Sequence, residues 1–307
     1  MFIMNQRREL KLLQVDVFTD TPYGGNPAAV ILAPESLNDE DMEKIAQEMN
    51  VRETVFVLKS KVADHRFRYM TPRGEIDFSG HATIAAFHAL IHAGLVEIYR
   101  DETMVSFETK AGLLQADIVK NETTRLHEVQ ITHQRPRFLD TYDPNDFNEA
   151  LGLTLADIDR LVPMQTVSTG IPILVIPLST SKAFEKIDCD WNRLVELQQG
   201  ADFGSVCVFT RDTHDETSDA QVRHFAPSLG VNEEPVSGAA AACVASYLIR
   251  YGIVDDTLGV ASIIIEQGHS VGRPGRSFVE VRGDRENIEL VKVSGTGVLV
   301  MTGTIYI

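Results

Sequence analysis

The side chains best suited to chemistry in this 307-residue sequence are a glutamate and a histidine, Glu53 and His81. Glu53 precedes the apolar run 54–58, and burial in a cleft would raise its pKa and suit it to acid/base catalysis. The alternative is a solvated carboxylate at a strand end. His81 is either a buried structural histidine or a proton carrier that contacts substrate. The two residue types indicate proton transfer, with both alternatives open.

His81 lies at the start of a segment that changes from polar and glycine residues, Ser79-Gly80, to small and apolar ones. Such a run predicts a helix buried on all sides. The first N–H groups of a helix lack partners within it, and the helix dipole makes that end partly positive. Because Gly80 also lets a ligand approach the backbone, we expect Gly80 and His81 to bind an anion such as a carboxylate.

A second helix start of the same kind occurs at Ser237-Gly238-Ala239, before another run of small and apolar residues. Glu233 and Glu234 precede it, and they either complement the helix dipole or bring a carboxylate to the same cleft. Ser79 and Ser237 occupy matching positions, and we expect both to act mainly as N-caps. Two such helix starts predict a duplicated domain with one site between the copies.

The second half of the chain repeats the order of the first half. Segment 222–227 corresponds to 67–72, segment 263–266 corresponds to 105–108, and a helix expected over 183–199 corresponds to one over 38–49. Collinear repetition indicates tandem copies of one fold. We predict an α+β protein of two pseudo-symmetric domains, each a barrel-like sheet around a central helix. The expected domains are 1–133 and 134–295, with a last strand at about 296–307 packing with the first.

Composition excludes several classes of function. The net charge of −16 makes nucleic acid and anionic membranes poor partners. Residues 1–11 lack the apolar core of a secretory signal, and we expect no membrane span. The cysteines, Cys189, Cys207 and Cys243, are few and widely spaced, and the histidines show no metal-ligand spacing. These features favour a cytoplasmic protein without a metal site.

The order and spacing of several short motifs resemble those of the phenazine-biosynthesis isomerase-like (PhzF-like) family, within the diaminopimelate epimerase fold. The resemblance runs from residue 14 to about 302 and rests on segments 15–19, 25–30, 50–56, 80–85, 225–227, 233–240 and 272–275. It implies a cofactor-free two-domain enzyme, often a homodimer, that acts in the cleft between its domains. It further implies that Glu53 is the acid/base that moves a proton.

The resemblance also assigns roles to other residues. His81 matches the family's active-site histidine, Gly80 helps bind the substrate, and Glu234 is a further catalytic carboxylate. The expected substrate-binding positions of the second helix start are Ser237, Gly238 and Ala239.

The chain departs from the related sequences at positions that bear on the substrate. Glu234 stands where the family usually has Asp, and Ala239 stands where it usually has Ser. The related epimerases have cysteines where this chain has Ser79 and Ser237, and a serine hydroxyl is too weak an acid to replace a thiol. These changes disfavour racemisation and indicate a substrate other than the dihydro-hydroxyanthranilate of phenazine synthesis.

We therefore predict a cytoplasmic, cofactor-independent isomerase that moves a proton within a small carboxylate-bearing substrate. Two alternatives remain. One is an amino-acid epimerase or lyase on the same fold. The other is a non-catalytic small-molecule-binding protein, for which Ala239 is the best support.

Overall fold

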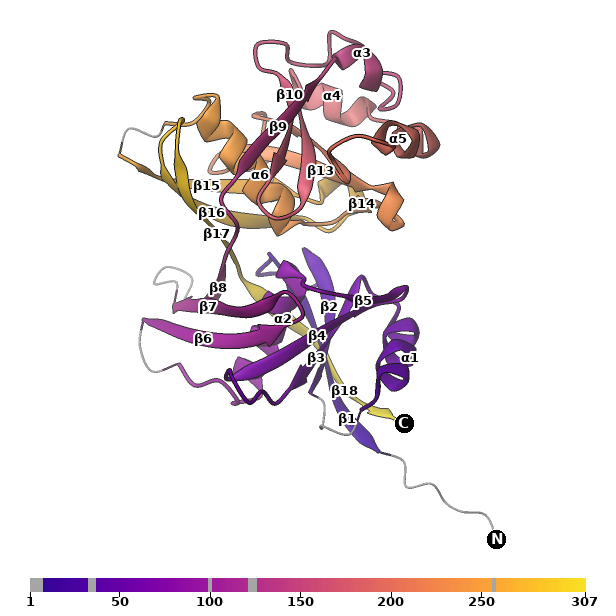
Figure 1. Cartoon of the computed structure of the whole chain (residues 1–307), viewed down its shortest axis with the longest axis vertical. Helices are drawn as coiled ribbons and strands as arrows, with labels where there is room; N and C mark the ends of the chain where they lie inside the picture. Colours follow the sequence, from indigo (N-terminus) through magenta and orange to yellow (C-terminus); the bar gives the residue numbers. More distant parts are fainter. Residues whose placement is uncertain (1–7, 33–36, 99–100, 121–125, 256–257) are drawn as a thin grey trace. The chain divides into compact units, whose positions relative to one another are not determined.

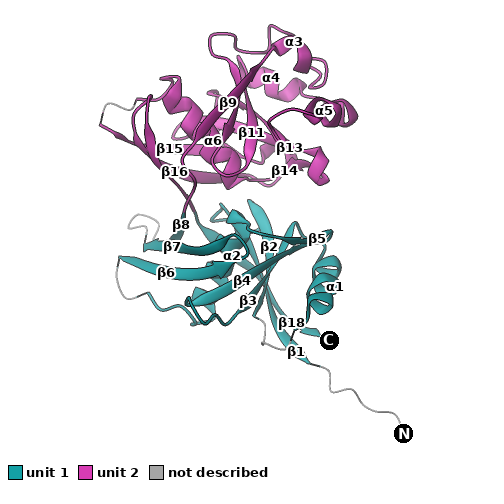
Figure 2. Ribbon diagram, in the orientation of Figure 1, with its two compact units in different colours: residues 1–131, 295–307 teal, residues 132–294 magenta. Residues whose placement is uncertain are grey.

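Short runs of β-branched and aromatic residues, interrupted by glycine turns, give this chain a sheet-rich α+β structure. The computed structural model describes residues 8–32, 37–98, 101–120, 126–255 and 258–307. The chain divides into two compact units (Figures 1 and 2). Unit 1 consists of residues 1–131 and 295–307, and unit 2 consists of residues 132–294.

The elements of unit 1 are mostly strands, with one helix on the outside of the sheet and one largely buried helix. The strands are β1 (Glu9–Val17), β2 (Asn26–Leu32), β3 (Glu53–Leu58), β4 (His65–Thr71), β5 (Gly74–Ile76), β6 (Glu102–Thr109), β7 (Gly112–Lys120), β8 (His127–Thr132) and β18 (Gly297–Tyr306). The helices are α1 (Asp39–Met49) and α2 (Gly80–His92).

Unit 2 has the same character. Its strands are β9 (Arg137–Tyr142), β10 (Met164–Ser168), β11 (Pro172–Pro177), β12 (Ser205–Thr210), β13 (Ala220–Ala226), β14 (Val231–Glu234), β15 (Val260–Gln267), β16 (Gly275–Gly283) and β17 (Ile288–Gly295). Its helices are α3 (Pro144–Phe147), α4 (Ser181–Lys186), α5 (Trp191–Gln198), α6 (Gly238–Arg250) and the 3₁₀ turns η1 (Pro227–Leu229) and η2 (His269–Val271).

The strands of the two units pair in the same order and with the same directions. In unit 1, β2 runs parallel to β3, β3 antiparallel to β4, and β4 parallel to β6. In unit 2, β11 runs parallel to β12, β12 antiparallel to β13, and β13 parallel to β15. A short strand, β5 or β14, pairs antiparallel with β4 or β13 and leads into the buried helix. The two helix starts therefore follow equivalent strands.

The helices α2 and α6 supply much of the core. In α2 every residue from Ala82 to Phe87 is buried, and in α6 every residue from Ala240 to Ile249 is buried. Helix α2 packs against β1, β2, β3 and β18, while α6 packs against β10, β11, β12, β15 and β16. Small side chains allow this close approach of helix and strands. The small and apolar residues of α2 and α6 are thus buried, as the sequence predicted.

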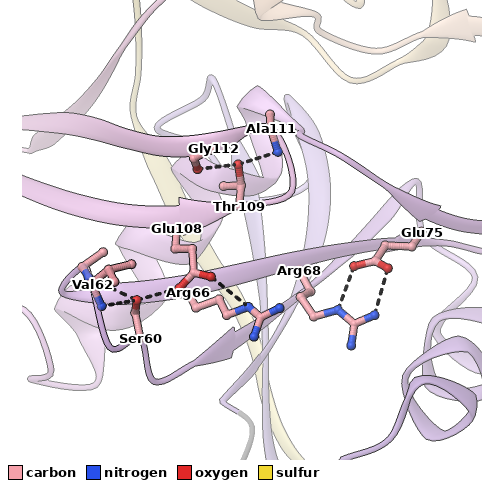
Figure 3. Close-up of polar contacts among 10 residues, drawn as sticks. Ser60, Val62, Arg66, Arg68, Glu75, Glu108, Thr109, Ala111 and Gly112 are labelled. Carbon is pink, nitrogen blue, oxygen red and sulfur yellow. Dashed lines mark hydrogen bonds and ion pairs between the residues drawn. The ribbon is translucent and has the colours of Figure 1, made fainter.

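A charged fork holds the strand that leads into α2. Arg68 in β4 donates to both carboxylate oxygens of Glu75 in β5, at 2.7 and 2.8 Å (Figure 3). The guanidinium also contacts Asp39 in the first turn of α1. In unit 2 Arg223 makes the same two bonds to Glu233, each 2.9 Å long. Bidentate pairs fix geometry as well as charge, so each fork orients the strand before a helix start.

One helix prediction was wrong. The sequence suggested a single helix over 183–199, but the structure contains α4 and α5 separated by residues 187–190. Asp190 caps α5 by accepting a hydrogen bond from the N–H of Arg193 at 3.0 Å, which starts a new helix. Among the helices that the structure describes, none is long and apolar enough to cross a membrane.

Candidate active site

The Glu53 carboxylate is placed by the parallel pairing of β2 and β3. Glu53 is the first residue of β3 and lies opposite Ala28 of β2. Only 4% of Glu53 is exposed to solvent. The alternative that Glu53 is a solvated carboxylate at a strand end is therefore wrong. A buried carboxylate needs a compensating partner.

His81 provides that partner. It is the second residue of α2, and its Nε2 lies 2.8 Å from Oε2 of Glu53. Both side chains are largely buried. The contact is an ion pair when the imidazole is protonated. The structure thus brings together two residues that are 28 positions apart in the chain.

Arg52 adds a positive charge on the other side of the carboxylate. Its Nε lies 3.5 Å from Oε1 of Glu53. Burial alone would raise the pKa of Glu53, but His81 and Arg52 together outweigh burial and hold that pKa below its usual value. The expectation of a raised pKa was therefore wrong, because it considered burial without these two neighbours. Glu53 is ionised at neutral pH, which is the form that a general base requires.

A chain of hydrogen bonds fixes the first turn of α2. The Oγ of Ser79 accepts from the N–H of Ala82 at 3.4 Å and lies 3.4 Å from Nδ1 of His81. The Thr83 hydroxyl donates to the backbone oxygen of Ser79 at 2.7 Å and contacts the Tyr69 hydroxyl at 2.6 Å. Ser79 is thus an N-cap, as expected, and the imidazole is held from both of its nitrogens.

Gly80 leaves room beside this helix start. Apart from its two chain neighbours and the backbone of α2, a Cβ built on Gly80 would meet no heavy atom of the described residues within 4 Å. The space beside the Cα of Gly80 is therefore open. Open space next to an imidazole and a carboxylate is suitable for a small ligand with a negatively charged group.

The other candidate residues lie together in unit 2. Ser237 caps α6 by accepting from the N–H of Ala240 at 3.2 Å, as expected, and Gly238 and Ala239 form the first turn. Glu234 ends β14 and is buried. The structure therefore gathers Glu53, His81 and Gly80 in unit 1, and Glu234, Ser237, Gly238 and Ala239 in unit 2. That the two groups of residues contact the same substrate stays a prediction.

The sequence interpretation missed three polar residues near the second helix start. Gln267 accepts from the N–H of Ser237 at 3.1 Å and donates to the backbone oxygen of Glu234 at 2.8 Å. The Nε2 of His224 contacts the Ser205 hydroxyl at 2.8 Å. The internal repeat could have pointed to His224. It aligns Arg223-His224-Phe225 with Arg68-Tyr69-Met70, so an ionisable histidine stands in unit 2 where unit 1 has a tyrosine.

Metal ligands do not gather in the described part of the chain. No group of three or more His, Cys, Asp or Glu side chains there is arranged to hold a metal ion. The site consists of a carboxylate, an imidazole and backbone N–H groups.

Comparisons with known proteins show the family to which the chain belongs. The sequence profile of the family described as "Phenazine biosynthesis-like protein" (PhzC-PhzF) matches residues 15–303. The "Uncharacterized isomerase YfhB" of Bacillus subtilis (strain 168) is 33% identical over 299 residues, covering 97% of this chain and 98% of that protein. The crystal structure of the Bacillus anthracis phenazine biosynthesis protein of the PhzF family superposes with a TM-score of 0.90 at 30% identity. That match covers 98% of this chain and 100% of the other.

A more distant structure shares the fold alone. The hydroxyproline epimerase from Agrobacterium vitis, solved with bound trans-4-hydroxy-L-proline, has a TM-score of 0.64 at 16% identity. The match covers 97% of this chain and 93% of the epimerase.

Proposed function

Since this chain belongs to the phenazine biosynthesis-like family and is an isomerase of that kind, we propose that it moves a proton within a small carboxylate-bearing substrate. The observation that carries the proposal is the 2.8 Å contact between the buried Glu53 carboxylate and His81 at the start of α2. The proposed reaction needs no cofactor, because acid/base chemistry alone can shift a proton between carbons.

Each group has a distinct part in the proposed mechanism. The N–H groups at Gly80 and His81, at the positive end of α2, bind the substrate carboxylate and stabilise negative charge on the deprotonated intermediate. Glu53, ionised because its pKa is lowered, removes a proton from one carbon and returns it to another. His81 stabilises the charged form of Glu53 before the transfer. Burial of both side chains limits exchange of the moving proton with water.

The epimerase alternative is weaker for a chemical reason. Two-base racemisation needs an acid on each face of the substrate, and the hydroxyls of Ser79 and Ser237 instead accept N-capping hydrogen bonds. A neutral hydroxyl is also far less acidic than a thiol. The observation that favours a binding protein without catalysis remains the alanine at position 239, where the family usually has serine.

The role of unit 2 is a further part of the proposal. We propose that Glu234, Ser237, Gly238 and Ala239 contact the same substrate, and that the units are two copies of one barrel-like fold. The matching strand order supports the second statement. The protein is also proposed to be a cytoplasmic homodimer, and light scattering of the purified protein tests whether it is a dimer.

A carboxylate-to-amide substitution tests the proposal. Small carboxylic acids that raise the melting temperature would be incubated with the protein in D₂O, and deuterium incorporation followed by NMR. The panel includes trans-4-hydroxy-L-proline and dihydro-hydroxyanthranilate. Glu53→Gln should lower the exchange rate by about 10²–10⁴-fold while the acid still binds. The control Glu48→Gln makes the same change on the exposed side of α1 and should leave the rate unchanged.

Two results would argue against this function. Equal exchange rates in the wild type and Glu53→Gln would remove Glu53 from the mechanism. Binding of the acids with neither deuterium exchange nor an isomerised product in the spectrum would favour the non-catalytic alternative.

A further inference from the structure

Unit 2 contains a second carboxylate that faces a histidine, at a different position in the fold from Glu53 and His81. His224 in β13 lies directly opposite Glu234 in β14. Residues opposite each other in an antiparallel pair have Cβ atoms about 4.5–5.5 Å apart and point to the same face. Arg223 and Glu233, one residue earlier in each strand, form their fork on the other face. The fork therefore fixes the register that places the imidazole opposite the carboxylate.

The surroundings of this pair are shielded from water. The exposed fractions are 7% for His224, 7% for Glu234 and 2% for Ser205. The Ser205 hydroxyl lies 2.8 Å from Nε2 of His224. An ionised carboxylate can only accept hydrogen bonds, and burial makes a donor valuable to it. When the hydroxyl donates to Nε2, the ring proton is on Nδ1, where it can be donated towards Glu234.

The backbone of Glu234 is held separately. The Gln267 side chain donates to the backbone oxygen of Glu234 and accepts from the N–H of Ser237. The carboxylate-bearing residue is thereby fixed relative to the cap of α6. Gln267 contacts the backbone oxygen of Glu234 and does not by itself orient the carboxylate. His224 lies opposite Glu234 in the strand pair and is in the position to do so.

Unit 1 shows that the fold does not require such a pair. The residues at the equivalent register are Tyr69 and Ile76, and the Tyr69 hydroxyl contacts Thr83 instead. A phenol opposite an isoleucine gives a stable β4–β5 pair without a carboxylate or an imidazole. The stability of the strand pair therefore does not explain why His224 and Glu234 stand at these positions in unit 2.

We propose that His224 is a positioning residue that orients the Glu234 carboxylate, with Ser205 fixing the tautomer of the imidazole. The inference rests on the proposed function in one respect, namely that Glu234 contacts the substrate. Ser205, His224 and Glu234 then form a hydrogen-bonded series that prepares the carboxylate for a polar group of the substrate before binding.

The tautomer can be measured without a ligand. In protein labelled with ¹⁵N-histidine, the His224 resonances are assigned by their loss in His224→Gln. The expected result is a proton on Nδ1, a shift of the Nδ1 resonance in Glu234→Gln, and a changed Nε2 resonance in Ser205→Ala. The control Tyr247→Phe removes a different buried hydrogen bond of unit 2, to the backbone oxygen of Pro163, and should leave both resonances in place.

A proton on Nε2 in the wild type, or an Nδ1 resonance that Glu234→Gln does not move, would overturn the proposal. If His224→Gln does not fold, the resonances lost in His224→Asn give the assignment instead, and the Ser205→Ala and Glu234→Gln spectra then decide the question. This measurement does not depend on catalysis, so its failure is distinguishable from a failure of the proposed function.

Kinetics with any acid of the panel that exchanges deuterium gives the second readout. His224→Gln keeps a polar group near Ser205 but lacks the Nδ1 donor, and it should raise KM about tenfold, the loss of one charge-assisted hydrogen bond. His224→Asn places an amide near the Nδ1 position and should recover part of that loss. An equal KM increase in Tyr247→Phe would show a general loss of packing and contradict the positioning role.

Discussion

The starts of α2 and α6 share one frame and carry different chemistry. Each helix is capped by a serine, Ser79 or Ser237, that accepts a hydrogen bond from the third residue after it. Each is preceded by a short strand held by an Arg–Glu fork. The position after the glycine is His81 in one unit and Ala239 in the other. The common frame fixes the backbone, and single side chains decide which groups can transfer a proton.

The strand beside each helix start differs in the same way. The first residue of β3 is Glu53, whereas the first residue of the equivalent strand β12 is Ser205. Unit 1 therefore has its carboxylate–imidazole pair between a strand and a helix, while unit 2 has His224 and Glu234 on two paired strands. This difference suggests that proton transfer belongs to the first helix start and substrate orientation to the second.

The equivalent residues of the two first turns provide the sharpest test of that division. His81→Asn should lower kcat/KM about 100-fold, the lower end of the range for positioned proton transfer. Ala239→Ser, which introduces the hydroxyl that the family resemblance implies at this position, should change kcat/KM by less than about tenfold. Steady-state rates of both variants with an exchanging acid check this. Similar losses in the two variants would contradict the division of roles.

The same His81 variant should also change the pH dependence. The pKa of Glu53 is lowered, so its base form persists in the wild type until the pH falls below the ordinary value of 4.5. Without His81, burial is opposed only by Arg52, and the acid limb of kcat/KM should move to higher pH. An acid limb that stays in place would show that His81 does not act on Glu53.

Acid stability tests a feature that the two units have in common. Burial lowers the pKa of His88 in unit 1 and of His133 in unit 2 to about 4 each, against an ordinary 6.5. A lowered histidine pKa stabilises the fold above pH 6.5 and loses that effect as the pH falls towards 4. Each histidine should cost about 2 kcal/mol between pH 6.5 and 5.

Denaturant unfolding at several pH values measures this loss. His88→Gln and His133→Gln should each reduce the drop by about 2 kcal/mol. A drop that persists unchanged in one variant would show that only the other unit is acid-sensitive.

Removing the N-caps of α2 and α6 should have the smallest effects on stability, and the two effects should be similar. Ser79→Ala and Ser237→Ala each remove one N-capping hydrogen bond, and each should lower the free energy of unfolding by about 1 kcal/mol. Thermal unfolding of the two variants gives the comparison. A clearly larger loss at Ser79 would mean that its contact with His81 contributes to stability in addition to the cap.

The sequence predicted the frame of the site better than its electrostatics. Serine followed by glycine and small residues predicted both capped, buried helices, because capping and burial depend on local residue types. The approach of Glu53 to His81 depends on the pairing of β2 with β3 and could not follow from spacing alone. The predicted rise in the pKa of Glu53 was wrong for the same reason, since the positions of His81 and Arg52 relative to the carboxylate depend on the tertiary structure.

The central claim, that Glu53 both removes and returns the proton, can be tested with a labelled substrate. An exchanging acid would be deuterated at the carbon that loses its proton and converted in ordinary water under single-turnover conditions. If one buried carboxylate carries the proton, part of the deuterium should appear at the new carbon of the product. Product with no deuterium at that carbon in any turnover would indicate two separate groups and contradict the account.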